Sequence, residues 1–419
     1  MGTPVKNPER PGEPRPKLEF PPISSRTPDV REKAESAIRS FSIVLGGPLY
    51  EFLLRHGVVR FALPNVFRRI AALVALTWLP LLLLSLKDGL AFGGRVQVPL
   101  LYDFAIYGRF LLALPLLVLA EVVIDPAIRQ AVAEFVEAHF VKDEELPKFE
   151  GVLVKMQQLR DWWIPEAIIF LLAFFPVFLY QRGFTVAASS WHTTNGHLTA
   201  AGWWFAAFST PVVRFICYRW LFRYFVWTAL LRRISGLNLA LMPTHPDHAA
   251  GLNFLALAQK RFGILFCSFG CMFAGGVANR MAFEGASVNS LRFLIAGFIV
   301  LSLILGLVPL LMLAPKLSKV RRKGLVEYGR LANSYTESFD RKWVRGVEGS
   351  SEELLGTGDI QSLADMGNSF ALVDAMTIAP ITKRLVLQLT AQAALPLIPV
   401  IVLGTPTPEL VHAIIKMLA

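Results

Sequence analysis

The sequence predicts an all-α, polytopic membrane protein with about seven transmembrane helices and additional amphipathic cytoplasmic helices. First, 54% of the 419 residues are hydrophobic, only 17% are charged, and the mean hydropathy is +0.49. Soluble domains average roughly 45–50% apolar and 25% charged residues. Second, several charge-free runs are long enough to cross a bilayer. Third, the basic residues are unevenly distributed between successive loops. This composition argues against a soluble globular enzyme, a disordered chain and a fibrous protein.

Seven runs qualify as transmembrane helices, each of which needs about 20 mostly apolar residues. Residues 293–314 and 385–404 carry no charged side chain and are the clearest. Residues 104–124 are the weakest run, because Arg109 and Glu121 bracket its apolar stretch. The predicted spans are 70–86, 104–124, 164–180, 199–220, 262–281, 293–314 and 385–404.

The loops of this seven-span layout differ sharply in basic charge. The N-terminal segment and every second loop contain 32 Lys and Arg residues, whereas the three alternate loops contain 4. Cytoplasmic loops are the ones enriched in Lys and Arg, so the N-terminus is expected to be cytoplasmic. The C-terminus lies outside if the run 385–404 crosses the membrane, and inside if that run re-enters.

The remaining segments divide the chain around the membrane domain, which occupies residues 70–314. A Pro-rich, charged leader at 1–30 is expected to be disordered, and 31–69 is a juxtamembrane cytoplasmic segment. Helical periodicity predicts amphipathic cytoplasmic helices over 127–160. Residues 315–384 form a basic cytoplasmic helical segment, in which Asp359 is a candidate N-cap. A short amphipathic tail follows at 407–419.

Arginine side chains on one predicted helix are the first candidate site. Ionisable groups at membrane depth are costly and often functional. Arg214, Arg219 and Arg223 lie on the helix that begins at the predicted span 199–220. At 100° per residue Arg214 points about 140° away from Arg219, which does not fit the single stripe of a voltage sensor. Two interpretations remain: an inner-end cluster that faces lipid headgroups, and an anion-binding site.

The densest polar segment is PTHPDHAAGL, residues 243–252. His245, Asp247 and His248 are candidate metal ligands, because imidazole and carboxylate groups bind divalent metals. The alternative is structural: Thr244 caps the next helix and pairs with Asp247 in a capping box. The segment matches no zinc signature such as HExxH.

Prolines and tryptophans give weaker signals in the spans. Pro80 and Pro309 are among the prolines found in every predicted span but the fifth, and kinked helices often line water-filled sites. Trp191, Trp203 and Trp204 gather where the predicted fourth span begins, as in an interfacial aromatic belt.

Three short segments resemble a group of uncharacterised bacterial multi-pass inner-membrane proteins. They are the PTHPD-x-A-x-GL turn at 243–252, GGPLY at 46–50 and DIQSLADMGNSF at 359–370. The resemblance implies location in the bacterial inner membrane and transfers no activity.

Three hypotheses for the function follow, in decreasing order of preference. The first is a channel or carrier for a small solute, an anion in particular, that uses Arg214 and the kinked helices. The second is a non-catalytic scaffold or sensor that docks a cytoplasmic partner. The third is a membrane enzyme that uses a divalent metal at the 243–252 turn; the other two need no cofactor. Expected partners are membrane lipid and a cytoplasmic protein or a second copy. The net charge of +11 is interpreted as a topology signal and not as a nucleic-acid footprint.

Overall fold

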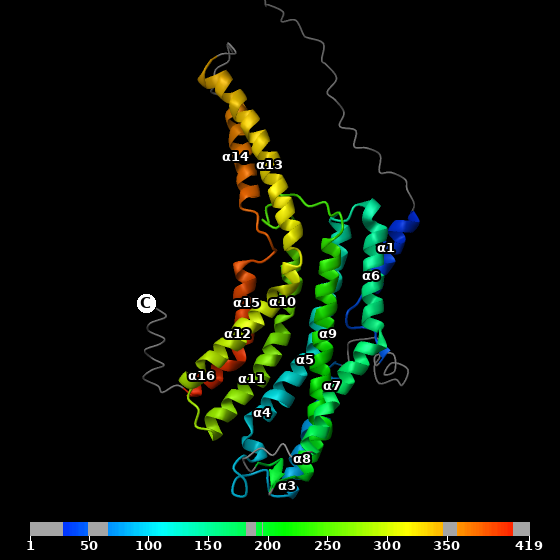
Figure 1. Ribbon diagram of the computed structural model, residues 1–419, viewed down its shortest axis with the longest axis vertical. Helices are drawn as coiled ribbons and strands as arrows, with labels where there is room; N and C mark the ends of the chain where they lie inside the picture. Colours follow the sequence, from blue (N-terminus) through cyan, green and yellow to red (C-terminus); the bar gives the residue numbers. More distant parts are fainter. Residues whose placement is uncertain (1–27, 49–65, 182–189, 195, 347–357, 405–419) are drawn as a thin grey trace, which may run out of the picture.

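The computed structural model describes residues 28–48, 66–181, 190–194, 196–346 and 358–404. It is helical apart from one short hairpin, in which β1 (Thr193–Thr194) pairs with β2 (His197–Leu198). Figure 1 shows an elongated helical bundle.

Five helices among the described residues are long and apolar enough to cross a membrane, so the chain is a multi-pass helical membrane protein. They match five of the seven predicted runs. The corresponding elements are α3 (Val66–Lys87), α4–η3–α5 (Phe104–Ile106, Tyr107–Ala113 and Leu114–Glu137), α10–α11 (Phe254–Arg261 and Gly263–Phe283), α12 (Val288–Leu311) and α15–η7–α16 (Lys383–Ala394, Leu395–Leu397 and Ile398–Gly404).

The other two predicted runs are helical, but their crossing of the membrane stays a prediction. Residues 164–180 coincide with α7 (Trp163–Gln181), of which the last side chains lie outside the described part. Residues 199–220 belong to a continuous helix made of α8 (Ala200–Trp204), η5 (Phe205–Ser209) and α9 (Thr210–Ser235). Five arginines on α9 set this helix apart from the five apolar ones.

The described connections are sorted between the two ends as the charge pattern predicts. One end carries α1 (Pro28–Ser40), η4 (Asp143–Glu145), α6 (Leu146–Asp161), the loop 236–253, and the hairpin of α13 (Ala314–Phe339), η6 (Asp340–Val344) and α14 (Asp359–Asp374) (Figure 1). The other end carries the segment 88–103 with η2 (Leu100–Tyr102), the β-hairpin and the α11–α12 turn. We call the first the hairpin end, after the helical hairpin of α13 and α14, and the second the turn end, after the α11–α12 turn.

The last apolar helix runs from one end to the other. A Cβ atom added to Gly404 would meet the side chains of Met281 and Val288, which flank the α11–α12 turn. The segment α15–η7–α16 therefore finishes at the turn end, opposite α14. This geometry favours a crossing segment over a re-entrant one.

The predicted start of a separate helix at residue 127 is wrong, whereas the position of residues 127–137 outside the membrane stays a prediction. Residues 127–137 do not start a separate helix, because α5 continues through Pro126 to Glu137. Their apolar face is nevertheless buried as expected, with Ile128, Val132 and Phe135 in the core of the hairpin end. The predicted tail 407–419 and most of the leader lie outside the described residues.

Glycines on α11 let neighbouring backbones approach closely. A Cβ atom on Gly275 would collide with the backbone of Phe104, and one on Gly108 of η3 would collide with the Cys271 carbonyl. Small residues at such contacts are the usual means by which membrane helices pack. The α4–η3–α5 helix is thereby fixed against α11.

Candidate functional site

The arginines of α9 fall into three different environments. Arg214 is half-buried and makes no hydrogen bond or ion pair with the described part of the chain. Arg223 is buried and forms an ion pair with Glu121. Arg219 is intermediate, because it forms one longer ion pair, with Glu166. The structure therefore groups Arg219 with Arg223 near the hairpin end and leaves Arg214 apart.

Arg223 and Arg69 share one carboxylate, that of Glu121. The distances are 3.0 Å from Arg223 Nη1 to Glu121 Oε1 and 2.8 Å from Arg69 Nη2 to Glu121 Oε2. The Arg223 guanidinium also lies over the Trp220 ring, 4.9 Å from its centroid. Glu121 of α5 thus joins α3 to α9, and its charge compensates the buried guanidinium.

Asp125, one turn along α5, holds the loop that follows α1. Its Oδ1 accepts hydrogen bonds from Ser42 Oγ at 2.6 Å and from the backbone N–H groups of Ile43 and Val44. Its Oδ2 accepts a hydrogen bond from Arg129 Nε at 2.7 Å. Arg160 of α6 donates to the Ser42 carbonyl from the other side. This network fixes loop 41–47, which includes Gly46 and Gly47 of the GGPLY segment.

Arg219 is held more loosely than Arg223. Its Nε lies 3.6 Å from Glu166 Oε1, beyond normal hydrogen-bond distance, and its guanidinium lies 5.8 Å from the Phe215 ring centroid. The adjacent cavity is lined by Gly46, Gly47 and the arginines and has a volume of about 20 Å³. That space holds about one water molecule. The geometry fits a single anionic oxygen better than a whole solute.

The turn at 243–253 is organised by the carboxylate of Asp247. Oδ1 accepts the N–H groups of Ala249 (2.8 Å) and Gly251 (3.0 Å), and Oδ2 accepts that of Asn253 (3.0 Å). Burial raises the pKa of Asp247, but these hydrogen bonds outweigh burial and hold the pKa below its ordinary value. The backbone can follow this path because His248 and Ala250 adopt positive φ.

The predicted capping box is wrong. The next helix, α10, begins at Phe254, ten residues after Thr244. The intervening residues form successive turns. The carboxylate of Asp247 accepts hydrogen bonds from backbone N–H groups of these turns and not from those of a helix N-terminus.

The predicted metal ligands are not assembled as a ligand set. His245 Nδ1 lies 2.8 Å from Asp247 Oδ1. In the part of the chain that the structure describes, no group of three or more His, Cys, Asp or Glu side chains is placed to hold a metal ion. The Asp247 oxygens are already occupied by backbone N–H groups. His248 contributes its carbonyl, which accepts hydrogen bonds from the Thr377 N–H (2.8 Å) and Oγ1 (3.0 Å).

These contacts give the turn a structural role, because they hold the root of the α13–α14 hairpin. A Cβ atom on Gly324 of α13 would collide with Pro243 and Val373. Arg321 of α13 donates to the carbonyl of Asp374 at 2.8 Å. Two of the three segments that carry the resemblance, 243–252 and 359–370, are thus linked through the residues after α14.

Comparison with protein-family models, with curated proteins and with solved structures gives no match. The resemblance of the three short segments therefore identifies no family.

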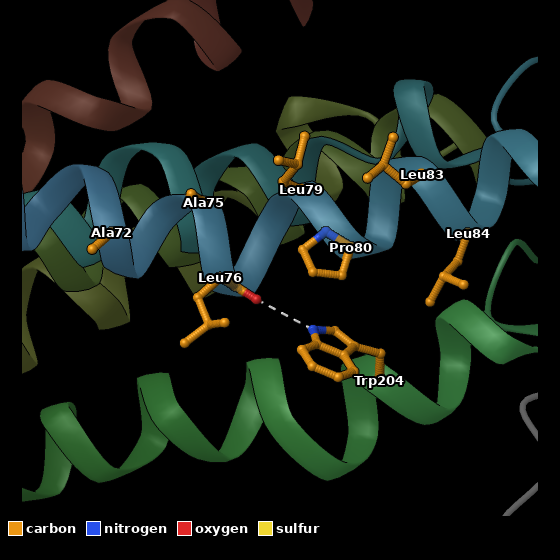
Figure 2. Close-up of a pocket in the computed structure, with 8 residues that line it drawn as sticks. All are labelled: Ala72, Ala75, Leu76, Leu79, Pro80, Leu83, Leu84 and Trp204. Carbon is orange, nitrogen blue, oxygen red and sulfur yellow. Dashed lines mark hydrogen bonds between the residues drawn. The ribbon is translucent and has the colours of Figure 1, made fainter.

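An apolar groove of about 600 Å³ lies on α3. Figure 2 shows its lining, which consists of Ala72, Ala75, Leu76, Leu79, Pro80, Leu83, Leu84 and Trp204. It offers no charged group to a solute. The proline-containing helix α3 lines a surface suited to lipid tails and not a polar path.

Sequence patterns missed two polar residues that join distant elements. Gln259 of α10 is fully buried, accepts a hydrogen bond from Trp227 Nε1 (3.0 Å) and donates to the Gly306 carbonyl (2.7 Å). Asp103, at the turn end, accepts hydrogen bonds from Trp191 Nε1 (2.9 Å) and Asn279 Nδ2 (2.7 Å). A polar residue at the edge of an apolar run was the only signal available for either one.

Proposed function

We propose that the protein is a non-catalytic membrane scaffold that presents the α13–α14 hairpin to a cytoplasmic protein partner. The observation that carries this proposal is the shape of the hairpin end: α13 and α14 project beyond the other described helices (Figure 1). We also propose that this end is cytoplasmic, in a bacterial inner membrane, because it holds the basic segments.

The hairpin supports itself and is fixed at both ends. Near its tip, the Asp359 carboxylate accepts hydrogen bonds from Trp343 Nε1 (2.8 Å) and Lys342 Nζ (3.0 Å). Asp359 is the first residue of α14 and not the N-cap that its sequence suggested, since Gly358 occupies that position. The turn around Asp247 fixes the root. Such a rigid projection loses little conformational entropy when a partner binds.

The exposed surface of the hairpin defines the partner's chemistry. Its basic part is the first arm: residues 314–346 contain nine Lys and Arg residues against three Asp and Glu residues, whereas α14 contains three Asp residues and no Lys or Arg. Val326 and Leu331 are exposed among the basic residues, 48% and 53% respectively. A basic surface with scattered apolar side chains suits an acidic protein surface.

The carrier hypothesis has less support from the geometry. The described cavities next to the arginines and the kinked α3 are either as small as one water molecule or apolar. It stays a prediction, and the loosely held Arg219 is the residue on which it depends.

The test uses the full chain in native membranes with a photo-crosslinking amino acid at position 331. Scaffolding predicts one discrete adduct that disappears when Arg330→Glu reverses the local charge. The same amino acid at position 154, an exposed site on α6, is the matched control. An adduct between two copies of this chain would show that the hairpin binds a second copy and not a different cytoplasmic protein. No adduct, together with anion flux in liposomes that Arg219→Gln abolishes, would overturn the scaffold in favour of the carrier.

A further inference from the structure

A mixed polar and apolar groove separates α5 from α10, on a different side of the bundle from the arginine cluster. Its volume is about 210 Å³. Ala127, Ala131, Phe254 and Leu257 provide apolar lining. The charged groups at the groove are Glu134 on α5 and Lys260 and Arg261 on α10.

These three charges do not neutralise one another. None of them forms an ion pair with any described residue, although they line one groove. Glu134 and Lys260 are half-buried, and Arg261 is exposed. A half-buried carboxylate opposite two cations is complementary to a ligand that carries both a cation and an anion.

The groove lies at the height of lipid headgroups. The helices Phe104–Glu137 and Phe254–Phe283 contain 34 and 30 residues. At 1.5 Å per residue they are about 51 and 45 Å long, whereas the hydrocarbon core is about 30 Å thick. They are level at the turn end, where the Phe104 N–H donates to Asn279 Oδ1 at 2.8 Å. The excess length of both therefore emerges at the hairpin end, where the groove lies.

The vertical order of the charges is also informative. The ring of Phe254 lies 5.2 Å from that of Phe135, which places the start of α10 beside the residue after Glu134. Because α10 runs back toward the membrane from there, Lys260 and Arg261 lie about 9 Å closer to the hydrocarbon core than Glu134. In an aminophospholipid the phosphate is likewise nearer the core than the terminal ammonium.

We propose that this groove binds the headgroup of a phospholipid with a primary amine, of the phosphatidylethanolamine type. Lys260 and Arg261 bind the phosphate, and Glu134 accepts hydrogen bonds from the ammonium. Leu257, 69% exposed, lies between these charges along α10 and contacts the two methylene carbons that join the phosphate to the ammonium. This site goes beyond the proposed scaffold function and does not depend on it.

Native mass spectrometry of the delipidated full chain tests the site, with micelles that contain equal amounts of phosphatidylethanolamine and phosphatidylglycerol. We expect retained phosphatidylethanolamine in excess, and Glu134→Gln to reduce that preference about tenfold, the effect of losing one charge-assisted hydrogen bond. Glu137→Gln, an exposed site on the same helix, is the matched control and keeps the preference.

Two further measurements test recognition of the phosphate and of the ammonium separately. Arg261→Gln is expected to weaken retention of both lipids, whereas Arg232→Gln, at the exposed end of α9, leaves it unchanged. Phosphatidylcholine is expected to compete poorly, because its quaternary ammonium has no N–H to donate. Equal retention of the lipids by the native chain, or an unchanged preference in Glu134→Gln, would overturn the proposal.

Discussion

The indole N–H of Trp204 donates to the carbonyl oxygen of Leu76, at an Nε1–O distance of 3.3 Å (Figure 2). Leu76 lies four residues before Pro80, whose nitrogen has no hydrogen to give that carbonyl. The same solution recurs in α12, where Tyr224 donates to the carbonyl of Leu305, four residues before Pro309. Side chains on the α8–η5–α9 helix thus donate to two carbonyl groups that proline leaves without a backbone donor.

This relationship makes a prediction about stability. Trp204→Phe should destabilise the protein by about 0.5–1.5 kcal/mol, the usual range of hydrogen bonds between membrane helices. In a Pro80→Ala background the restored N–H of residue 80 donates to the Leu76 carbonyl. Trp204→Phe should then lower the free energy of unfolding much less. Equilibrium unfolding in mixed micelles measures both values, with the exposed Trp203→Phe as the control. If Trp204→Phe destabilises the native chain and the Pro80→Ala chain equally, the indole of Trp204 does not replace the missing N–H of Pro80.

The carboxylate shared by Arg69 and Arg223 gives a second prediction. Glu121→Gln leaves two guanidinium groups without their counter-charge, one of them buried, and should cost about 3 kcal/mol. Glu35→Gln removes an exposed partner of Arg39 and should cost less than about 1 kcal/mol. The two variants are compared by thermal unfolding in one detergent. If they unfold at the same temperature, the buried network adds nothing beyond a surface ion pair.

The turn that holds the hairpin root should loosen in acid. The folded-state pKa of Asp247 lies below its ordinary value. Its stabilising contribution is therefore complete above the ordinary pKa of about 4 and is lost as the pH falls through the lowered value. Hydrogen exchange at the Asn253 amide, which donates to Asp247, reports this change.

The control for this pH effect is a carboxylate on the hairpin itself. Asp247→Asn should give fast exchange at Asn253 at every pH, whereas Asp365→Asn on the exposed face of α14 should leave the native pH profile intact. A pH profile unchanged in Asp247→Asn would assign the titration to another group.

Accessibility of introduced cysteines tests the assignment of the two ends. In a chain whose three native cysteines are replaced by serine, Arg330→Cys on α13 and Glu284→Cys in the α11–α12 turn place thiols at opposite ends. An impermeant maleimide should label the first only in inverted vesicles and the second only in right-side-out vesicles. Labelling of both from the same side would contradict the span assignment.

Much of the fold could be predicted because five long apolar runs are self-sufficient signals. The continuation of α5 through residues 127–137 could not, since proline ordinarily interrupts a helix and Pro126 stands just before these residues. Pro126 is accommodated within the helix, and the neighbouring Asp125 is already committed to loop 41–47. Local pattern gives no sign of such a distant partner.

The candidate sites were harder to predict, for the same reason. Asp247 was visible as part of a dense polar segment, but its role depends on amides up to six residues away in an irregular turn. Trp191 was expected in an interfacial belt. It is 1% exposed, because its indole binds Asp103, 88 residues earlier in the chain. Contacts across that separation exist only once the bundle has assembled.

The composition of the core at the hairpin end has a consequence for biogenesis. That single core joins Ala34 of α1 to Leu385 and Ala393 of α15, together with residues from α5, α6, α9, α10 and α12. Within it, α15 packs against α10, α11 and α12, so these helices complete their buried faces only after the final helix has been delivered. Until then they lack part of their native core, and truncation before α15 should yield a chain that quality-control proteases degrade.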